Sequence, residues 1–126
     1  IDCIATDHAP HGEEEKQGGM VGAPFGIVGI ETAFQLMYSN FVLGGVFTLK
    51  QLIDWMTVKP AALFGMESGT LDIGSQADIA IFDLENEYEI RSEDFLSKAT
   101  NTPFTGWKVK GETLYTIVDG KVVYAK

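Results

Sequence analysis

Residues 1–11 read Ile-Asp-Cys-Ile-Ala-Thr-Asp-His-Ala-Pro-His, a short apolar run that leads directly into a cluster of polar side chains. The apolar run at residues 1–6 predicts a strand buried on both faces, as in a parallel sheet. Pro10 lies inside the cluster and excludes the helix on which zinc proteases place two histidines. We therefore expect residues 7–11 to form a loop at the end of that strand, where α/β barrels carry catalytic groups.

The cluster combines one carboxylate, Asp7, with the only two histidines of the chain, His8 and His11. Asp7 could ligate a metal, orient a water molecule or accept its proton, or it could merely cap a backbone amide. His11 could be a ligand, an acid or base, or a cation that pairs with a substrate carboxylate, whereas we expect a supporting or packing role for His8. A catalytic zinc needs about three protein ligands. One short loop cannot supply them with good geometry, so the sequence does not complete a metal site.

Composition narrows the class of protein. The chain has 126 residues, 45% of them hydrophobic, and a mean hydropathy of +0.06, which indicates a globular protein. Its net charge of −9 argues against nucleic-acid binding, and no apolar run approaches the roughly 20 residues of a membrane span. The single Cys3 predicts a buried, unreactive thiol and a cytoplasmic location. A start at Ile1, without Met or a signal peptide, suggests a processed or truncated chain.

The middle of the chain predicts a loop followed by helices. Residues 12–22 are polar and glycine-rich, and they form either a solvated loop or a mobile lid. Apolar side chains at helical spacing predict a helix that Gly44 and Gly45 stop; they are Ile30, Ala33, Phe34, Met37 and Phe41.

Two further helices follow. Thr48 and Gln51 form a capping box that opens the first of them, with Leu49, Leu52, Ile53 and Met56 on one face. Pro60 can be the first residue of a short third helix that ends at Gly65. We expect these helices to supply core packing rather than sites.

From residue 67 onward the pattern changes to that of antiparallel strands. Residues 77–84 are a nearly continuous apolar run, and residues 87–91 and 107–109 alternate between apolar and charged side chains. Asp119-Gly120 lies between two apolar runs and is the strongest hairpin signal in the chain.

Several ordered motifs together resemble the C-terminal part of bacterial dihydroorotases, members of the amidohydrolase superfamily. The resemblance begins with residues 4–11 and continues through Glu14-Glu15-Lys16, residues 23–27 and residues 29–33. It extends through Lys59-Pro60-Ala61, Ala77-Asp78-Ile79, residues 95–98, Asn101-Thr102-Pro103-Phe104 and Gly106. A single Asp-His pair would be a weak signal, but this ordered series with intact loop spacing covers nearly the whole chain.

The resemblance implies an enzyme of pyrimidine biosynthesis that reversibly cyclises N-carbamoyl-L-aspartate to dihydroorotate, with one or two zinc ions in a (β/α)8 barrel. It assigns to Asp7 the roles of zinc ligand and catalytic base, which takes a proton from the attacking water and passes it to the leaving nitrogen. It assigns to His11 the binding of the substrate carboxylate, and to Phe25 and Gly26 backbone contacts with the substrate. An ionised, metal-bound carboxylate can accept a proton at neutral pH.

The resemblance also implies that further ligands, among them a His-x-His motif, precede Ile1. We therefore expect the last strand and helices of a barrel at residues 1–66 and a small antiparallel β-sandwich module at residues 67–126. The chain alone would be inactive, and its partners would be the rest of the barrel, a second copy or aspartate transcarbamoylase. The alternatives are a dihydropyrimidinase-like or allantoinase-like hydrolase, a non-catalytic partner of aspartate transcarbamoylase, and a purely structural β module.

Overall fold

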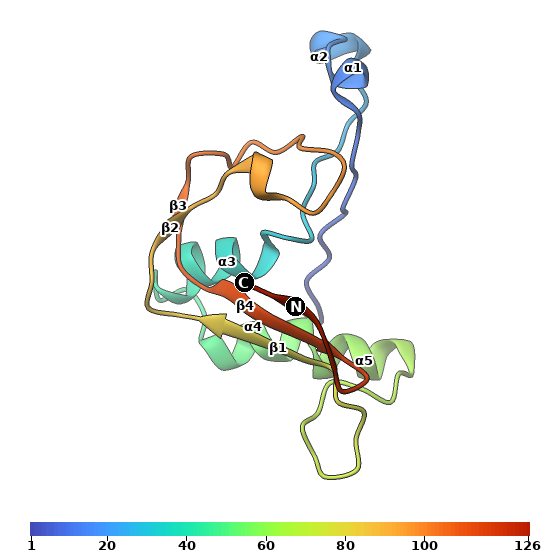
Figure 1. Cartoon of the computed structure of the whole chain (residues 1–126), viewed down its shortest axis with the longest axis vertical. Helices are drawn as coiled ribbons and strands as arrows, with labels where there is room; N and C mark the ends of the chain where they lie inside the picture. Colours follow the sequence, from blue (N-terminus) through green and yellow to red (C-terminus); the bar gives the residue numbers. More distant parts are fainter.

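The computed structural model describes all residues from Ile1 to Lys126 (Figure 1). Its elements, in chain order, are α1 (Glu13–Lys16), α2 (Gly19–Gly22), α3 (Ala33–Met37), the π-helix η1 (Tyr38–Val42), α4 (Leu49–Met56), α5 (Val58–Phe64), β1 (Ile79–Asp83), β2 (Tyr88–Glu89), the 3-10 helix η2 (Ser92–Asp94), β3 (Lys108–Val109), β4 (Glu112–Val118) and β5 (Lys121–Ala125). None of the helices combines the length and apolar character that a bilayer span requires.

The three predicted helices are present, with shifted bounds. The first begins at Ala33 rather than near Ile30, because Gly29 to Thr32 form a turn in which the Thr32 N–H donates to the Gly29 carbonyl. It continues without a break into η1. The predicted capping box opens α4: the Gln51 N–H donates to Thr48 Oγ1 at 3.2 Å, and the Thr48 N–H donates to Gln51 Oε1 at 2.8 Å.

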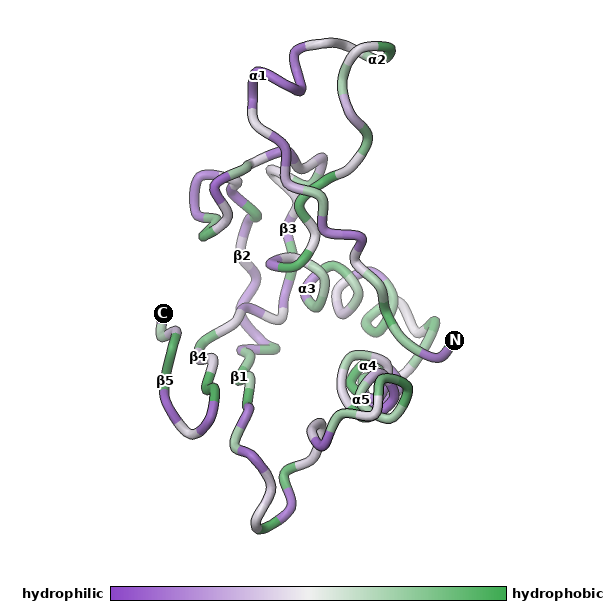
Figure 2. Tube along the Cα trace, turned by 90° about the vertical axis from the view of Figure 1, so that its right-hand side faces the viewer, coloured by the Kyte–Doolittle hydropathy of each residue, from purple (hydrophilic) through white to green (hydrophobic).

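The third helix, α5, begins two residues before Pro60 and ends where predicted, at Gly65. This glycine has a φ of 66°, in the left-handed conformation that favours glycine after a helix. In Figure 2, α4 and α5 are seen nearly along their axes and overlap in the view.

One core joins the helices to the strands. Phe34, Tyr38 and Leu52 are its buried centre, and Leu52 is fully enclosed. The Phe82 ring, from β1, stacks on the Phe34 ring with centroids 3.9 Å apart. Residues on both sides of the predicted domain boundary at 66/67 therefore share this core, and the boundary itself stays a prediction.

The strands form two small antiparallel sheets. The larger has the order β1-β4-β5, and the smaller pairs β2 with β3. The predicted hairpin at Asp119-Gly120 joins β4 to β5, and both residues have positive φ, 49° and 72°. Positive φ at both central residues is typical of the type I′ turn, whose twist matches that of the two strands it joins.

The predicted fold class is wrong for this chain. Residues 1–6 form no strand; their neighbourhood contributes a backbone hydrogen bond from Ile4 to Trp55 and one isolated parallel bridge between His8 and Ile27. A parallel strand needs a neighbouring strand to receive its backbone hydrogen bonds, and the chain supplies none beside residues 1–6. The chain runs from β1 into β2 and from β3 into β4, so the β2-β3 pair continues beyond the end of the β1-β4 pair. The two sheets do not form a sandwich (Figure 1). The chain therefore consists of short helices packed on small antiparallel sheets.

Three smaller expectations also change. Residues 12–22 contain two single-turn helices, α1 and α2, which project from the rest of the molecule at the top of Figure 1. Ile53 lies 44% exposed rather than on the buried face of α4. Cys3 is free but only half-buried, so its predicted burial is not observed.

Candidate functional site

Asp7 has the backbone feature that most distinguishes it from its neighbours. Its φ is 46°, a left-handed conformation that few residues other than glycine adopt, although Asp and Asn do so more readily than most. Its side chain is exposed, and it takes part in no ion pair and no cluster of three metal-ligating side chains. The carboxylate is therefore free to meet a ligand. Backbone conformations of this kind concentrate at functional sites.

His8 has a structural role. Its Nδ1 accepts hydrogen bonds from the backbone N–H groups of Gly29 and Ile30, at 3.0 and 3.3 Å. An accepting Nδ1 carries no proton, so the neutral ring would be protonated at Nε2. His8 joins residues 7–11 to the turn before α3, which agrees with the packing role predicted for it.

His11 is turned toward the segment that follows α2. Its Nε2 lies 3.0 Å from the Phe25 carbonyl oxygen, and its Nδ1 lies 3.5 Å from the Glu15 carboxylate. With a proton on Nε2 the ring donates to Phe25, and a fully protonated ring would also pair with Glu15. The structure thus brings two of the predicted site residues, His11 and Phe25, into contact.

Gly26 occupies a position that no other residue fits. Its φ is 122°, and a Cβ placed there would lie 2.4 Å from the Ala9 Cβ and 3.3 Å from His11 Nε2. Contacts that close require the backbone to move. Phe25, beside it, has a side chain 95% exposed, so within this chain Phe25 contributes through its backbone.

We call residues 7–11 and 23–27 the site loops. Two residues outside them make side-chain hydrogen bonds to them: Asn101 contacts both loops, and Lys16 contacts residues 23–27. Asn101 Nδ2 donates to the carbonyls of Ala9 and Gly26, both at 3.1 Å, and Asn101 Oδ1 accepts from the His11 N–H at 3.1 Å. Lys16 Nζ donates to the carbonyls of Pro24 and Gly26, at 2.6 and 2.7 Å.

The sequence analysis assigned no role to Asn101 or Lys16. Each was present only as one letter of a longer motif. Asn101 is 75 residues from Gly26 along the chain, and no local pattern links positions so far apart. Only their place in two of the motifs that carry the resemblance could have drawn attention to them.

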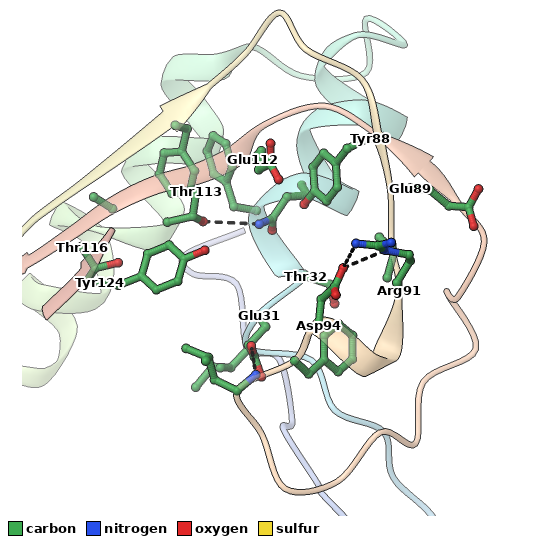
Figure 3. Close-up of a pocket in the computed structure, with 18 of the residues that line it drawn as sticks. Glu31, Thr32, Tyr88, Glu89, Arg91, Asp94, Glu112, Thr113, Thr116 and Tyr124 are labelled. Carbon is green, nitrogen blue, oxygen red and sulfur yellow. Dashed lines mark hydrogen bonds and ion pairs between the residues drawn. The ribbon is translucent and has the colours of Figure 1, made fainter. Parts of the chain in front are cut away.

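A groove lies elsewhere in the chain, and none of the predicted site residues lines it. It is an open groove of about 560 Å³ between the start of α3, strands of both sheets and the segment around η2 (Figure 3). Figure 3 shows Arg91 paired with Asp94 beside it, and the Arg91 Nη2 to Asp94 Oδ2 distance is 2.7 Å. Its wall includes Thr32, whose buried hydroxyl has no hydrogen-bond partner. The groove presents no nucleophile and base in contact, so it does not resemble a catalytic centre.

Tyr88 lines this groove and has a shifted ionisation. Burial raises the pKa of Tyr88 to about 12, and the nearby Glu112 carboxylate adds to the effect. Both causes disfavour the phenolate, the first by desolvation and the second by repulsion. At neutral pH Tyr88 is therefore a neutral phenol, with no part in acid–base chemistry.

The site loops can supply part of a metal site. Asp7 offers an exposed, unpaired carboxylate, a ligand that zinc accepts. No group of three or more His, Cys, Asp and Glu side chains lies together in the chain. His8 Nδ1 is already engaged, and His11 faces Phe25. The residues present fit one ligand of a metal site rather than a complete one.

The family model for the amidohydrolase family matches residues 1–123. The chain is 64% identical over 126 residues to a dihydroorotase of Enterococcus faecalis and 56% identical to one of Geobacillus thermodenitrificans. Both matches cover all of this chain, but only 30% and 29% of those proteins. The chain thus spans about 30% of the length of the curated relatives it matches.

Solved structures match the same architecture. A dihydropyrimidinase from Brevibacillus agri superposes with a TM-score of 0.92 at 30% identity, over 99% of this chain and 28% of that one. An L-hydantoinase from Arthrobacter aurescens superposes with a TM-score of 0.92 at 37% identity, over 100% of this chain and 29% of that one. Since the family model covers almost every residue, this chain belongs to the amidohydrolase family.

Proposed function

We propose that the full-length protein containing this chain is a dihydroorotase, which hydrolyses dihydroorotate to N-carbamoyl-L-aspartate and catalyses the reverse cyclisation in pyrimidine biosynthesis. One observation carries the proposal: His11 and the backbone of Phe25 and Gly26 belong to one hydrogen-bonded unit, and the unpaired Asp7 lies in the same loop as His11. Together these residues offer a carboxylate base, an imidazole that can carry a charge, and backbone groups that suit an acidic cyclic amide. Identities of 56–64% to dihydroorotases support the choice of substrate.

In this proposal the reaction breaks the ring C–N bond of dihydroorotate and forms a C–O bond to water. Asp7 accepts the proton that the attacking water loses and delivers it to the departing ring nitrogen, so the carboxylate is regenerated. His11, in its charged form, pairs with the substrate carboxylate. The backbone at Phe25 and Gly26 contacts the ring, and the missing side chain of Gly26 permits a close approach.

Zinc fits this site through Asp7. One or two bound ions would polarise the scissile carbonyl and make water reactive at neutral pH, and their other ligands would come from parts of the protein outside these residues. Asp7 would be both a ligand and the proton carrier, which its exposed and unpaired carboxylate allows.

A substrate panel tests the proposed function. The full-length protein is assayed with dihydroorotate, dihydrouracil, hydantoin and allantoin, and we expect the highest kcat/KM with dihydroorotate. Dihydrouracil is the matched comparison, because it lacks only the carboxylate that His11 is proposed to bind. Faster turnover of dihydrouracil or hydantoin would refute the dihydroorotase assignment.

Replacing His11 tests its part separately. His11→Ala should raise the KM for dihydroorotate by tenfold or more, because a charge-assisted contact contributes about 1.5–3 kcal/mol. Asn40→Ala is the control, because Asn40 Nδ2 donates to the Leu36 carbonyl and lies outside the site loops. An unchanged KM in His11→Ala would remove His11 from the substrate site.

The second candidate is a hydantoinase-like or dihydropyrimidinase-like hydrolase. It is favoured by the TM-scores of 0.92 to proteins with those names, at 30% and 37% identity. The higher identity to dihydroorotases leads us to rank it second. Assembly with a second copy or with aspartate transcarbamoylase stays a prediction.

A further inference from the structure

Several of the side-chain hydrogen bonds that hold the site loops in place include either one particular side chain or one particular carbonyl group. The side chain is that of Asn101, which comes from the segment between η2 and β3 and belongs to neither loop. The carbonyl group is that of Gly26, which receives two donors.

Both the oxygen and the nitrogen of the Asn101 side-chain amide make hydrogen bonds to the site loops. Its oxygen accepts from the His11 N–H, and its nitrogen donates to two carbonyls, those of Ala9 and Gly26, with each distance 3.1 Å. This pattern requires an amide in this orientation, since only the oxygen can accept and only the NH2 group can donate twice. The Asn101 backbone adds a fourth contact, because its carbonyl accepts from the Val28 N–H at 3.1 Å.

The Gly26 carbonyl is held from two sides. Asn101 Nδ2 and Lys16 Nζ reach the same oxygen, at 3.1 and 2.7 Å, and the two donors are 85 residues apart in the chain. A carbonyl oxygen has two lone pairs, and here both have donors. The orientation of this peptide group is therefore fixed by side chains rather than by a helix or a sheet.

No fully buried side chain of the site loops stands in for these bonds. None of the residues in the site loops is buried, and the Phe25 side chain is almost fully exposed. The loops are joined to each other by one backbone hydrogen bond, from the Ala9 N–H to the Ile27 carbonyl, and by the contact between His11 and Phe25. Without Asn101 and Lys16 the turn at Gly26 would have little to hold it beside His11.

We propose that Asn101 is a positioning residue for the substrate site, and that Lys16 assists it by binding the same Gly26 carbonyl. The inference rests on the proposed function, in which His11 and the Gly26 turn contact substrate. Asn101 itself touches neither the substrate nor the reacting bond. It keeps the Gly26 turn and His11 at a fixed separation, so that both contacts can be made together.

The test uses the full-length protein with Asn101→Asp. This variant keeps the size and the acceptor for His11, but it places a carboxylate oxygen against two carbonyl oxygens in place of the NH2 group. We expect the KM for dihydroorotate to rise about tenfold or more, from the loss of two hydrogen bonds. The kcat should change much less, because Asp7 is untouched. Asn40→Asp is the matched control: Asn40 Nδ2 also donates to a backbone carbonyl, that of Leu36, at 2.9 Å, but this bond lies within α3 and η1 and touches neither site loop.

Lys16 supplies a second arm that does not depend on the folding of the Asn101 variant. Lys16→Met should raise the KM and Lys16→Arg should restore it, because arginine keeps a charged donor. Lys59→Met is the control, since Lys59 Nζ also donates to a backbone carbonyl, that of Ile1, at 3.2 Å. In a double variant the two effects should be less than multiplicative, because both donors act on one carbonyl.

The outcomes separate this inference from the proposed function. If wild type turns over dihydroorotate and Asn101→Asp keeps the wild-type KM, or loses only thermal stability as Asn40→Asp does, the positioning role is overturned. If wild type prefers another cyclic amide, the dihydroorotase assignment fails. The same variants are then measured on that substrate, where a raised KM with little change in kcat would support positioning.

Discussion

The site loops and the core around Leu52 are stabilised by different interactions. The core buries aromatic and aliphatic side chains from α3, η1 and α4 against Phe82 of β1. The site loops contain no fully buried residue and depend on side-chain hydrogen bonds: His8 Nδ1 accepts from backbone N–H groups, and Lys16 and Asn101 donate to backbone carbonyls. The core can tolerate changes of shape that keep its volume, whereas each site-loop bond depends on a particular donor and acceptor. The comparison teaches that the site loops, which carry the candidate catalytic and binding residues, contain less buried apolar surface than the core around Leu52.

The largest expected effect is on chemistry alone. Asp7→Asn in the full-length protein removes the proposed base and should lower kcat by a factor of about 10²–10⁴, the range for loss of general acid–base catalysis. Stability should hardly change, because the side chain is exposed and asparagine tolerates positive φ. Steady-state kinetics and a thermal melt measure the two effects. Activity retained in this variant would remove Asp7 from the mechanism.

The second effect is on the core alone. Leu52→Ala leaves a cavity in a fully enclosed position and should lower the free energy of unfolding by about 2–5 kcal/mol. Ile53→Ala, one residue along α4 and 44% exposed, is the matched control and should cost much less. Denaturant unfolding of the full-length variants measures both. Equal losses would mean that the core is not centred on Leu52.

The third effect tests whether geometry alone can damage the site loops. Gly26→Ala introduces a Cβ that overlaps the Ala9 Cβ, in a backbone conformation with strain of about 1–3 kcal/mol for other residues. We expect kcat/KM to fall about tenfold or more. Gly19→Ala is the control: its φ of 65° is also positive, but no atom lies within 4 Å of the added carbon. A similar kinetic loss in both variants would show that strain, rather than contact with Ala9, disturbs the site.

The smallest effect is a pH dependence away from the site loops. The pKa of Tyr88 is raised from 10.0 to about 12, so the unfolded chain loses this proton at a lower pH than the folded one. The stabilising contribution is complete below pH 10 and is lost as the pH rises toward about 12. Tyr88→Phe should therefore make stability fall less steeply across that range, measured by denaturant midpoints at several pH values. An unchanged slope would contradict the assignment.

The sequence predicted the elements whose signals are local. The capping box at Thr48 and Gln51, the helix end at Gly65 and the hairpin at Asp119-Gly120 all depend on residues within one turn of each other, and all three are present. The strand predicted at residues 1–6 failed because strand formation depends on a neighbour. An apolar run indicates only that a segment prefers burial, and it does not indicate whether a neighbouring strand is present.

The candidate site divides in the same way. Asp7, His11 and Gly26 could be selected from their residue types and motif, and their assigned roles stay predictions. The sequence could not predict that His11 contacts the Phe25 carbonyl. It also could not predict that Lys16 and Asn101 donate to the same oxygen, that of Gly26. The motif around Asn101 marks that segment as similar to the family, but it does not show that the Asn101 side chain reaches Ala9, His11 and Gly26.

By itself, then, the sequence determined which side chains capable of binding or catalysis the chain contains. It also determined where the local turns and helices lie, because those depend on side-chain type and short spacing. Only the tertiary structure decided which of those groups meet. Hydrogen bonds between residues 75 to 92 positions apart hold the site loops, and such contacts form only after the helices and sheets have placed the segments side by side. The dense cluster at residues 7–11 gains its candidate partners, Phe25, Gly26 and Asn101, in that last step.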